Sequence, residues 1–401
     1  MDYDLLIVGG GLAGNCLALA LKNSGLKIAI IEAQERETLQ TAALGDRALA
    51  LAAGTVEALK SLNLWQGIEH AATPIEHIHI SNKGHFGKTR LSAYTENVAA
   101  LGYVITARDL ESHIADQFSA AENIIVYCPA RVMGLMADEN AVFVNLKHRD
   151  ETLNLTAKLV VGADGGNSSV RQLLNIEQQV SDYAQTALVT TITAARPHKN
   201  TAYERFTSSG PLALLPMGTH NFAVVWTRKT EEAESLMLGG ENDFIEHLQQ
   251  CFGWRLGELR LSAPRRAFSL SLIRAKAMIS QRAAIIGNAA HQLHPVAGQG
   301  FNLGLRDVMV LAEMLRVQNE TGDIGAGEFL QRFSQARQSD QSRTIHFTDL
   351  VVQIFSNEWL ALAAVRNIGL ALLDVLPFAK TRLARQAMGL STSVARVNNQ
   401  Q

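Results

Sequence analysis

The feature that most constrains this chain is a glycine-rich turn within its first fourteen residues. An apolar run at residues 3–8 leads directly into Gly9, Gly11 and Gly14, and a segment with helical character follows at residues 12–24. In such a G-x-G-x-x-G turn, the first glycine permits the tight bend and the second lets the backbone approach a pyrophosphate. The third lets the helix pack closely on the strand. The pattern predicts a βαβ unit with a dinucleotide pyrophosphate at the helix N-terminus.

A second expected strand, at residues 27–31, ends at Glu32. An acidic side chain at this place binds ribose hydroxyls and argues against a 2′-phosphate on the nucleotide. A G-x-G-x-x-G turn alone is weak evidence, and a glycine-rich turn in an ordinary βαβ unit is the alternative. Because strand, helix, second strand and acid occur in order, the dinucleotide site is the preferred interpretation.

The composition is that of a globular protein with room for two or three domains. The 401 residues are 47% hydrophobic and 18% charged, and the net charge of −2 gives no general attraction to nucleic acid. The three cysteines are far apart and no cluster has metal-ligand spacing, so we expect a reducing compartment and no metal. The first strand begins near Met1 and no run of eighteen apolar residues occurs. We therefore expect a cytoplasmic protein without a signal peptide or a spanning helix.

Hydrophobic periodicity predicts an α/β fold that is divided along the sequence. Buried parallel-type strands are expected at residues 3–8, 159–163 and 283–287, and a long helix at 301–319. Short strands separated by turn signals dominate residues 182–275, which is typical of an antiparallel sheet. We therefore predict a Rossmann-like domain with an inserted antiparallel β-sheet substrate domain and a helical C-terminal region. The expected limits are 1–70 with 100–180 and 275–350, then 71–99 with 181–274, and finally 351–401.

Two later segments share the form of the first, an apolar strand followed by glycine and small polar residues. They are residues 162–171 (GADGGNSSVR) and 287–304 (GNAAHQLHPVAGQGFNLG). The carboxyl ends of parallel strands meet at one edge of an open α/β sheet, where ligands bind. The three segments are therefore expected to surround one ligand, although each alone could be a structural turn.

Taken together, these segments resemble the single-component, class A FAD-dependent aromatic hydroxylases over nearly the whole chain. Residues 9–14 match the family's FAD pyrophosphate fingerprint, and residues 163–165 match its DG motif, which is associated with FAD and NAD(P)H. Asn288 stands where the family usually has the aspartate of its GD motif. The stretch 293–307 is most similar to the hydroxylases of ubiquinone biosynthesis, in particular the 2-polyprenyl-6-methoxyphenol hydroxylase branch, with which the asparagine is associated.

The resemblance implies a flavoprotein monooxygenase. NAD(P)H, a transient co-substrate, reduces FAD, and one atom of O₂ enters an electron-rich ring, here that of a polyprenylated methoxyphenol in ubiquinone biosynthesis. Only one G-x-G-x-x-G turn follows a strand, which fits a transient nicotinamide. The alternatives are a class A hydroxylase of a small soluble phenol and a non-catalytic flavin-fold protein that binds lipid. Oxygen-dependent consumption of NAD(P)H separates the enzymes from the binder.

Residues 295–304 are rich in glycine and precede a helix, and backbone N–H groups at the N-terminus of that helix can stabilise negative charge on a reduced flavin. Asn288 can bond a ribityl hydroxyl through its side-chain oxygen. Two arginines have alternatives: Arg47 can pair with neighbouring Asp46, and Arg108 can be a solvated helix residue. The resemblance and local sequence give these expected cofactor-binding residues: Gly9, Gly11, Gly14, Glu32, Arg47, Arg108, Asp164, Asn288, Pro295, Gly298, Gly300 and Asn302.

His294 is the candidate for proton transfer with a phenol, because histidine titrates near neutral pH. Packing of the loop is the alternative, and it is preferred for His291. Several positions in the inserted sheet resemble the family strand that roofs the substrate cavity or stand close to it. Ordinary sheet core is the alternative for each of them. These expected substrate-lining residues are Leu214, Pro216, Trp226 and Phe268.

The C-terminal region predicts contact with a membrane or a partner protein. Apolar runs between residues 359 and 373 are followed by Lys380, Arg382 and Arg385, and no acidic residue follows Asp374. A basic, apolar helix pair suits the anionic inner face of a membrane or another protein of ubiquinone biosynthesis. Packing of these helices on the body of the protein is the alternative.

Overall fold

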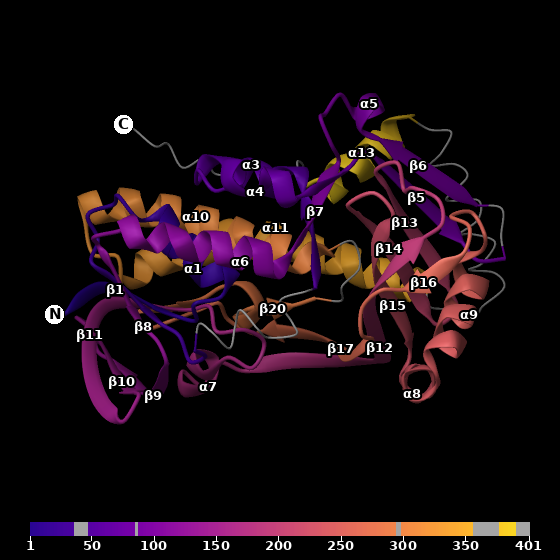
Figure 1. Cartoon of the computed structure of the whole chain (residues 1–401). Helices are drawn as coiled ribbons and strands as arrows, with labels where there is room; N and C mark the ends of the chain where they lie inside the picture. The colour runs from indigo at the N-terminus through magenta and orange to yellow at the C-terminus, as the bar shows by residue number, and fades with distance from the viewer. Residues whose placement is uncertain (36–46, 85–86, 294–297, 356–376, 390–401) are drawn as a thin grey trace.

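A computed structural model describes residues 1–35, 47–84, 87–293, 298–355 and 377–389. Two large sheets lie at opposite ends of the molecule (Figure 1). The long helices α10 (Gln299–Thr321) and α11 (Gly327–Phe355) run side by side between them. This arrangement confirms the α/β class with an additional β-sheet region and C-terminal helices.

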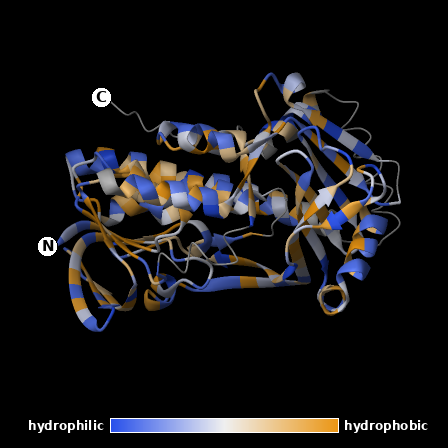
Figure 2. Ribbon diagram, in the orientation of Figure 1, coloured by the Kyte–Doolittle hydropathy of each residue, from blue (hydrophilic) through white to orange (hydrophobic). Residues whose placement is uncertain are grey.

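The first sheet has eight strands in the order β18-β19-β11-β1-β2-β8, and β10 and β9 extend it from β11. Its centre is parallel, since β1 pairs in parallel with β2 and β11, and β11 with β19. Strands buried on both faces are apolar. β2 and β19 are buried at every residue and consist only of Ile and Ala, and Figure 2 shows the centre of this sheet in hydrophobic colours. Its strands are β1 (Tyr3–Val8), β2 (Ile28–Ile31), β8 (Ile124–Tyr127), β9 (Ala130–Ala137), β10 (Val142–His148), β11 (Glu151–Gly162), β18 (Ile279–Ser280) and β19 (Ala283–Ile285).

The second sheet has nine strands in the order β20-β17-β12-β15-β14-β13-β5-β6, with β16 paired to β12. It is antiparallel except where β13 pairs in parallel with β5, a departure from the purely antiparallel sheet that the sequence predicts. A parallel pair needs a long connection, and here more than a hundred residues separate the two strands. Its strands are β5 (His77–Asn82), β6 (Lys88–Ser92), β12 (Gln178–Ala194), β13 (Thr201–Thr207), β14 (Gly210–Met217), β15 (Asn221–Lys229), β16 (Leu259–Leu261), β17 (Arg266–Ala275) and β20 (His291–Gln292). We propose that the two sheets mark the two expected domains.

A small sheet, β3-β7-β4, joins these parts, and helices cover the sheets. Of the helices in the described residues, none combines the length and apolarity needed to cross a bilayer. The small sheet has β3 (Ala48–Ala52), β4 (Thr73–Ile75) and β7 (Gly102–Thr106). The other helices are α1 (Leu12–Ala20), α3 (Ala53–Ser61), α4 (Trp65–Ile68), α5 (Ala93–Glu96), α6 (Ala107–Asp116), α7 (Ser169–Leu173), α8 (Thr230–Leu238), α9 (Glu241–Phe252) and α13 (Pro377–Ala387), with short 3-10 turns at η2 (Glu69–Ala71), η3 (Gln117–Ala120) and η4 (Gly287–Ala289).

Most expected elements are present, but two have different limits. The first helix ends at Ala20 rather than Ser24, because residues 21–24 form a turn. One of the short strands expected within residues 182–275, at residues 187–193, is the C-terminal half of β12, which begins at Gln178 and ends at Ala194. The first residues of β12 are exposed and mostly polar. They therefore lack the alternation of apolar and polar residues by which a strand is recognised in a sequence. Backbone pairing with β17 holds them in the sheet.

The second sheet presents two different faces. Leu214 and Trp226 point to one face, where they are fully buried with Phe244 of α9. We call this the helix face, because α8 and α9 cover it. Successive residues of a strand point to opposite faces, so Leu215 lies on the inner face, where it packs in a cluster with Val104 of β7.

Because the two faces are buried to different extents, truncating the neighbouring leucines Leu214 and Leu215 should lower the free energy of unfolding by different amounts. Leu214→Ala should lower the free energy of unfolding by about 2–5 kcal/mol, because a fully buried side chain leaves a cavity. Leu215→Ala should cost less, since Leu215 is only half-buried. Equilibrium unfolding in urea measures both variants, and equal losses would contradict this division of the sheet.

Candidate functional site

The three glycine-rich segments meet at the carboxyl ends of the parallel strands. Gly9 has a φ of +106°, and a Cβ there would lie 2.5 Å from the carbonyl oxygen of Ala163. A Cβ on Gly14 would overlap the carbonyl oxygen of Gly9, so both positions require glycine. A Cβ on Gly11, in contrast, would meet no atom within 4 Å. The protein therefore needs Gly9 and Gly14 for its own packing, whereas Gly11 leaves open space that a ligand can use.

Glu32 lies beside this turn, at the end of β2. Its Oε2 accepts a hydrogen bond from the backbone N–H of Gly10 at 2.6 Å, and its Oε1 accepts one from Gln34 at 2.7 Å. A carboxylate offers about four lone-pair sites, so these bonds fix its orientation and leave acceptor capacity for hydroxyl groups. This placement supports contact with a ribose.

Asp164 connects the second segment to the first. Its Oδ2 accepts hydrogen bonds from the backbone N–H groups of Ser169 (2.7 Å) and Val170 (3.1 Å) and so caps α7. Its Oδ1 is buried and has no partner among the described residues. A buried carboxylate oxygen without a donor costs free energy. We therefore expect a donor from a bound molecule at this atom.

Arg171 fastens the second segment to the third and was not predicted from the sequence. It is almost completely buried, and its guanidinium donates to the carbonyl oxygens of Ala289 (2.9 Å) and Gly166 (2.8 Å). Ala289 lies 118 residues further along the chain. No local pattern distinguishes Arg171 from a surface arginine, because its partners are backbone carbonyls that only the fold brings near.

Asn288 and Asn302 have different environments in the third segment. Asn288 is exposed in η4, and its side chain makes no hydrogen bond within the described residues, so it is available to a ligand. Asn302 is buried, and its Oδ1 accepts from the N–H of Ala52 (2.9 Å) and the hydroxyl of Thr55 (2.6 Å). Its Nδ2 donates to Gly298 (2.7 Å) and to a carbonyl of β3. We therefore propose that Asn302 positions the loop and does not contact the cofactor.

The start of α10 supplies backbone N–H groups to the same region. Gly298 has a φ of +62° at the residue before the helix, and Gly300 has open space where a Cβ would stand. His294 and Pro295 lie outside the described residues.

Arg47 and Arg108 come together with two carboxylates, although they are far apart in sequence. Burial raises the pKa of Glu111, the charges of Arg47 and Arg108 oppose this increase, and Glu32 adds to it. These four side chains therefore share one neighbourhood at the edge of the open space. Asp46, the other possible partner of Arg47, lies outside the described residues. The sequence analysis missed Glu111, although its spacing from Arg108 places both on one side of a helix.

Three of the four expected substrate-lining residues point to the helix face, away from the inner face of the sheet. Leu214 and Trp226 are buried under α8 and α9, and Pro216 points to the same helix face because it follows Leu214 by two residues. Phe268 pairs with Ala187, which neighbours Leu188 of the helix-face core, so Phe268 points to the inner face. It remains a proposed contact.

A continuous row of side chains crosses the middle of the inner face. In register from β12 to β5, it consists of Val189, Val225, Ala213, Glu204 and Ile80. All five are half-buried, although their strands are interior to the sheet. Side chains there stay partly accessible only when a space adjoins them. We therefore propose that this row lines a space on the inner face.

The small sheet links that space to the glycine-rich segments. Ala48 of β3 packs in the same cluster as Leu215 of the inner face. Two residues along β3, the carbonyl oxygen of Ala50 accepts a hydrogen bond from Asn302 at 3.0 Å. The inner face therefore lies close to the start of α10.

Glu204 is the carboxylate of the row and was not predicted from the sequence. Burial raises its pKa to about 7. In contrast to Glu32 and Asp164, its side chain makes no hydrogen bond within the part of the chain that the structure describes. A pKa near neutrality suits a group that gains and loses a proton. Within the described residues, no group of His, Cys, Asp or Glu could hold a metal ion.

A buried charge network supports the site from behind. His291 Nε2 lies 2.7 Å from Asp307 Oδ2, and Arg337 donates to Asp307 Oδ1 at 2.7 Å. Arg337 also bonds Asp340, which pairs with Arg306 at 2.8 Å. The network joins β20, α10 and α11. His291 thus has the structural role that was preferred for it.

Asp307→Asn should lower the free energy of unfolding by about 3 kcal/mol at pH 7, because it breaks a fully buried ion pair. Burial alone would raise the pKa of Asp307, but His291 and Arg337 outweigh it, and the pKa falls below its usual value. A lowered carboxyl pKa stabilises the fold above about pH 4, and that stability is lost on acidification. Unfolding between pH 3 and 7 should therefore show a steeper acid loss for the wild type than for the variant. Parallel profiles would contradict this.

Comparison with known proteins agrees with this geometry. A family model described as FAD binding domain matches residues 2–347. Ubiquinone hydroxylase UbiL of Rhodospirillum rubrum is 34% identical over 392 residues, which cover 96% of this chain and 89% of that protein. The 3-demethoxyubiquinol 3-hydroxylase of Escherichia coli is 28% identical over 393 residues, covering 96% and 98%.

Solved structures show the same fold. The crystal structure of p-nitrophenol 4-monooxygenase PnpA from Pseudomonas putida has a TM-score of 0.80 at 16% identity, covering 98% of this chain and 99% of that one. PqsL from Pseudomonas aeruginosa, described as a probable FAD-dependent monooxygenase, has a TM-score of 0.77 at 19% identity and covers 92% and 99%. The chain therefore belongs to the FAD-binding-domain family and is an FAD-dependent flavoprotein monooxygenase of the aromatic hydroxylase type.

Proposed function

We propose that this enzyme hydroxylates the aromatic ring of a polyprenylated methoxyphenol in ubiquinone biosynthesis, with NAD(P)H and O₂ as co-substrates. The names of the relatives UbiL and 3-demethoxyubiquinol 3-hydroxylase support the pathway. The observation that carries the proposal is the half-buried row on the inner face, four aliphatic side chains with Glu204 among them.

FAD fits the residues at the strand ends. The space beside Gly11 suits the pyrophosphate, the unpartnered Oδ1 of Asp164 suits a hydroxyl donor, and Glu32 suits the ribose. Bound FAD supplies the acceptance of a hydride from NAD(P)H and the activation of O₂. We propose these contacts with FAD from the described residues: Gly9, Gly11, Gly14, Glu32, Arg47, Arg108, Asp164, Asn288, Gly298 and Gly300. Pro295 and the proton-transfer role of His294 remain predictions.

Glu204 is the proposed acceptor for the phenolic proton. A phenol has a pKa near 10, and burial brings the pKa of Glu204 to about 7. The ionised carboxylate accepts a hydrogen bond from the phenol and takes its proton onto Oε as negative charge develops on the ring oxygen. Loss of that proton makes the ring more electron-rich and therefore a better target for an electrophilic oxygen. The aliphatic neighbours exclude water from this contact.

The length of the row distinguishes a prenylated substrate from a small phenol. Strands in a sheet are about 4.8 Å apart, so the row from Val189 to Ile80 spans about 19 Å. A single phenol ring needs only part of this length. The remaining aliphatic surface suits a polyprenyl tail, and this favours the methoxyphenol proposal over the small soluble substrate.

Gly11→Val should remove most bound flavin while leaving the fold intact. Residue 11 has an extended backbone with a φ of −78°, and its Cβ meets no protein atom, so valine fits the protein but fills the pyrophosphate space. Gly14→Val should destabilise the fold itself, because its Cβ overlaps Gly9. Flavin absorbance and thermal unfolding separate the two effects. Wild-type flavin content in Gly11→Val would contradict this placement.

Glu204→Gln should lower kcat on the phenol by about 100-fold or more, which is the usual contribution of a positioned base. Because the carboxylate must be ionised to accept the proton, wild-type activity should fall as the pH drops below about 7, and the variant should lack that limb. Flavin content should not change. Glu258→Gln, an exposed carboxylate paired with Arg260, is the matched control. The role is excluded if the pH profile of Glu204→Gln equals that of the wild type.

A further inference from the structure

Two adjoining cavities of about 410 Å³ and 260 Å³ lie over β5, β6 and β13. Tyr203 pairs in register with His79 and with Leu214, so these cavities open on the helix face, on the opposite side of the sheet from Glu204. Their described lining contains no Asp or Glu. It contains four cationic side chains, Lys88, Arg90, Arg205 and Arg255.

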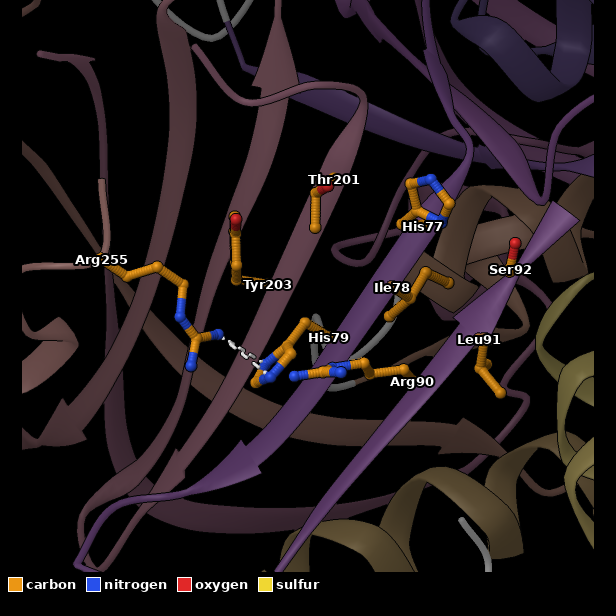
Figure 3. Close-up of a pocket in the computed structure, with 9 residues that line it drawn as sticks. All are labelled: His77, Ile78, His79, Arg90, Leu91, Ser92, Thr201, Tyr203 and Arg255. Carbon is orange, nitrogen blue, oxygen red and sulfur yellow. Dashed lines mark hydrogen bonds between the residues drawn. The ribbon is translucent and has the colours of Figure 1, made fainter. Parts of the chain in front are cut away.

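Two guanidinium groups converge on His79, which both cavities share. Figure 3 shows Arg255 and Arg90 approaching His79 from different sides. Arg255 Nη1 lies 3.0 Å from Nε2 of His79, and its guanidinium stands over the ring of Tyr203 at 5.8 Å. Burial, together with the charges of Arg255 and Arg90, lowers the pKa of His79 to about 4. The neutral imidazole therefore holds Arg255 in place and adds no negative charge to balance it.

Arg205 carries an unsatisfied donor in the same lining. Its Nε is buried and has no hydrogen-bond partner in the part of the chain that the structure describes. Burial lowers the pKa of Arg205, and the nearby charge of Arg255 contributes to this decrease. A buried donor without an acceptor is costly, and the lining supplies no carboxylate. An oxyanion from outside the chain would satisfy it.

We propose that these cavities bind the phosphate headgroup of an anionic phospholipid and so dock the enzyme on a membrane surface. Arginine guanidinium groups bind phosphate oxygens through paired, charge-assisted hydrogen bonds. Arg90 and Lys88 are exposed on β6, which is the edge strand of the sheet. A headgroup can therefore enter from the edge without rearrangement of the strands.

Helix α13 favours a lipid headgroup over a soluble phosphate ester as the molecule that supplies the phosphate. Ala384 and Met388 pack against Leu91 of β6, in a cluster on the reverse side of the same strands. On its outer side, α13 exposes Phe378 (82% exposed) and the basic residue Arg382. An exposed aromatic ring beside basic side chains suits the interface of an anionic bilayer. A soluble phosphate ester would need the cavities but not this helix.

Docking at this edge also positions the half-buried row of the inner face relative to the membrane. This consequence rests on the proposed function. The row on the inner face ends at Ile80 of β5, next to the edge strand β6. A polyprenyl tail that follows the row therefore points toward the edge that carries α13 and the cavities. Docking at this edge brings the row to the lipid phase without a membrane-spanning segment.

The test is cosedimentation of the holoenzyme with vesicles of phosphatidylcholine alone or mixed equally with phosphatidylglycerol. We expect binding to the anionic vesicles only, and at least tenfold weaker binding for the double variant Arg90→Gln with Arg255→Gln. The matched control removes two exposed basic charges elsewhere, Arg260→Gln with Lys276→Gln, and should bind like the wild type. Because Arg255 packs on Tyr203, the single variant Arg90→Gln on the exposed edge strand tests the site if the double variant is unstable.

Equal losses in the double variant and its control would overturn the site, because charge alone would then explain the binding. Saturable binding of glycerol 3-phosphate without any binding to anionic vesicles would overturn the membrane as the source. Hydroxylation of a short-chain phenol in solution should be unchanged in the Arg90 variants. Vesicle binding without hydroxylation of any phenol would contradict the proposed function while leaving this inference intact.

Discussion

The parallel pairing of β1 with β11 is the constraint on which the rest of the structure depends. Leu5 of β1 pairs in register with Leu159 of β11, although these residues are far apart in the sequence. At the carboxyl end of β1, Gly9 lies against the backbone of Ala163 so closely that no side chain fits between them. The DG motif thereby reaches the pyrophosphate turn. Arg171 then bonds the backbone of the third segment, and the three glycine-rich segments form one site.

The second constraint is the alternation of side chains along the strands of the second sheet. Leu214 and its neighbour Ala213 point to opposite faces of the sheet. Leu214 is buried under two helices, whereas Ala213 lies beside Glu204 on the inner face. The helix face stabilises the sheet by apolar burial, and this leaves the inner face able to hold a half-buried carboxylate. The same alternation places His79 and Tyr203 on the helix face, where Tyr203 packs against Phe252 at the end of α9 and cationic side chains gather beside it.

Buried charge is used in two opposite ways in this protein. Asp307 and Asp340 are paired with arginines, so their charge is balanced and their pKa values are lowered. Glu204 has no such partner, so burial raises its pKa into the range of proton transfer. A buried carboxylate that is surrounded by cations therefore stays ionised and has a structural role. A buried carboxylate that is surrounded by aliphatic side chains has a raised pKa and can gain and lose a proton.

The sequence by itself determined the fold class and FAD as the cofactor, and it predicted where the cofactor binds. The turn at Gly9–Gly14 and the motif at Asp164 are local patterns, because a glycine that must bend or yield space can be recognised from its own neighbours. The sequence predicted Trp226 at the substrate and gave no signal for Glu204, because the exposed face of a strand depends on what covers its other face. The tertiary structure decided which face is covered: α8 and α9 pack over Trp226, and Glu204 lies on the inner face, where we propose that the substrate binds. It also showed that Asn302 uses its hydrogen bonds within the protein and that Arg255 meets His79 across 176 residues of chain. Residues so far apart in the sequence come into contact only because the folded chain brings their strands and helices together. A local sequence pattern carries no information about such contacts.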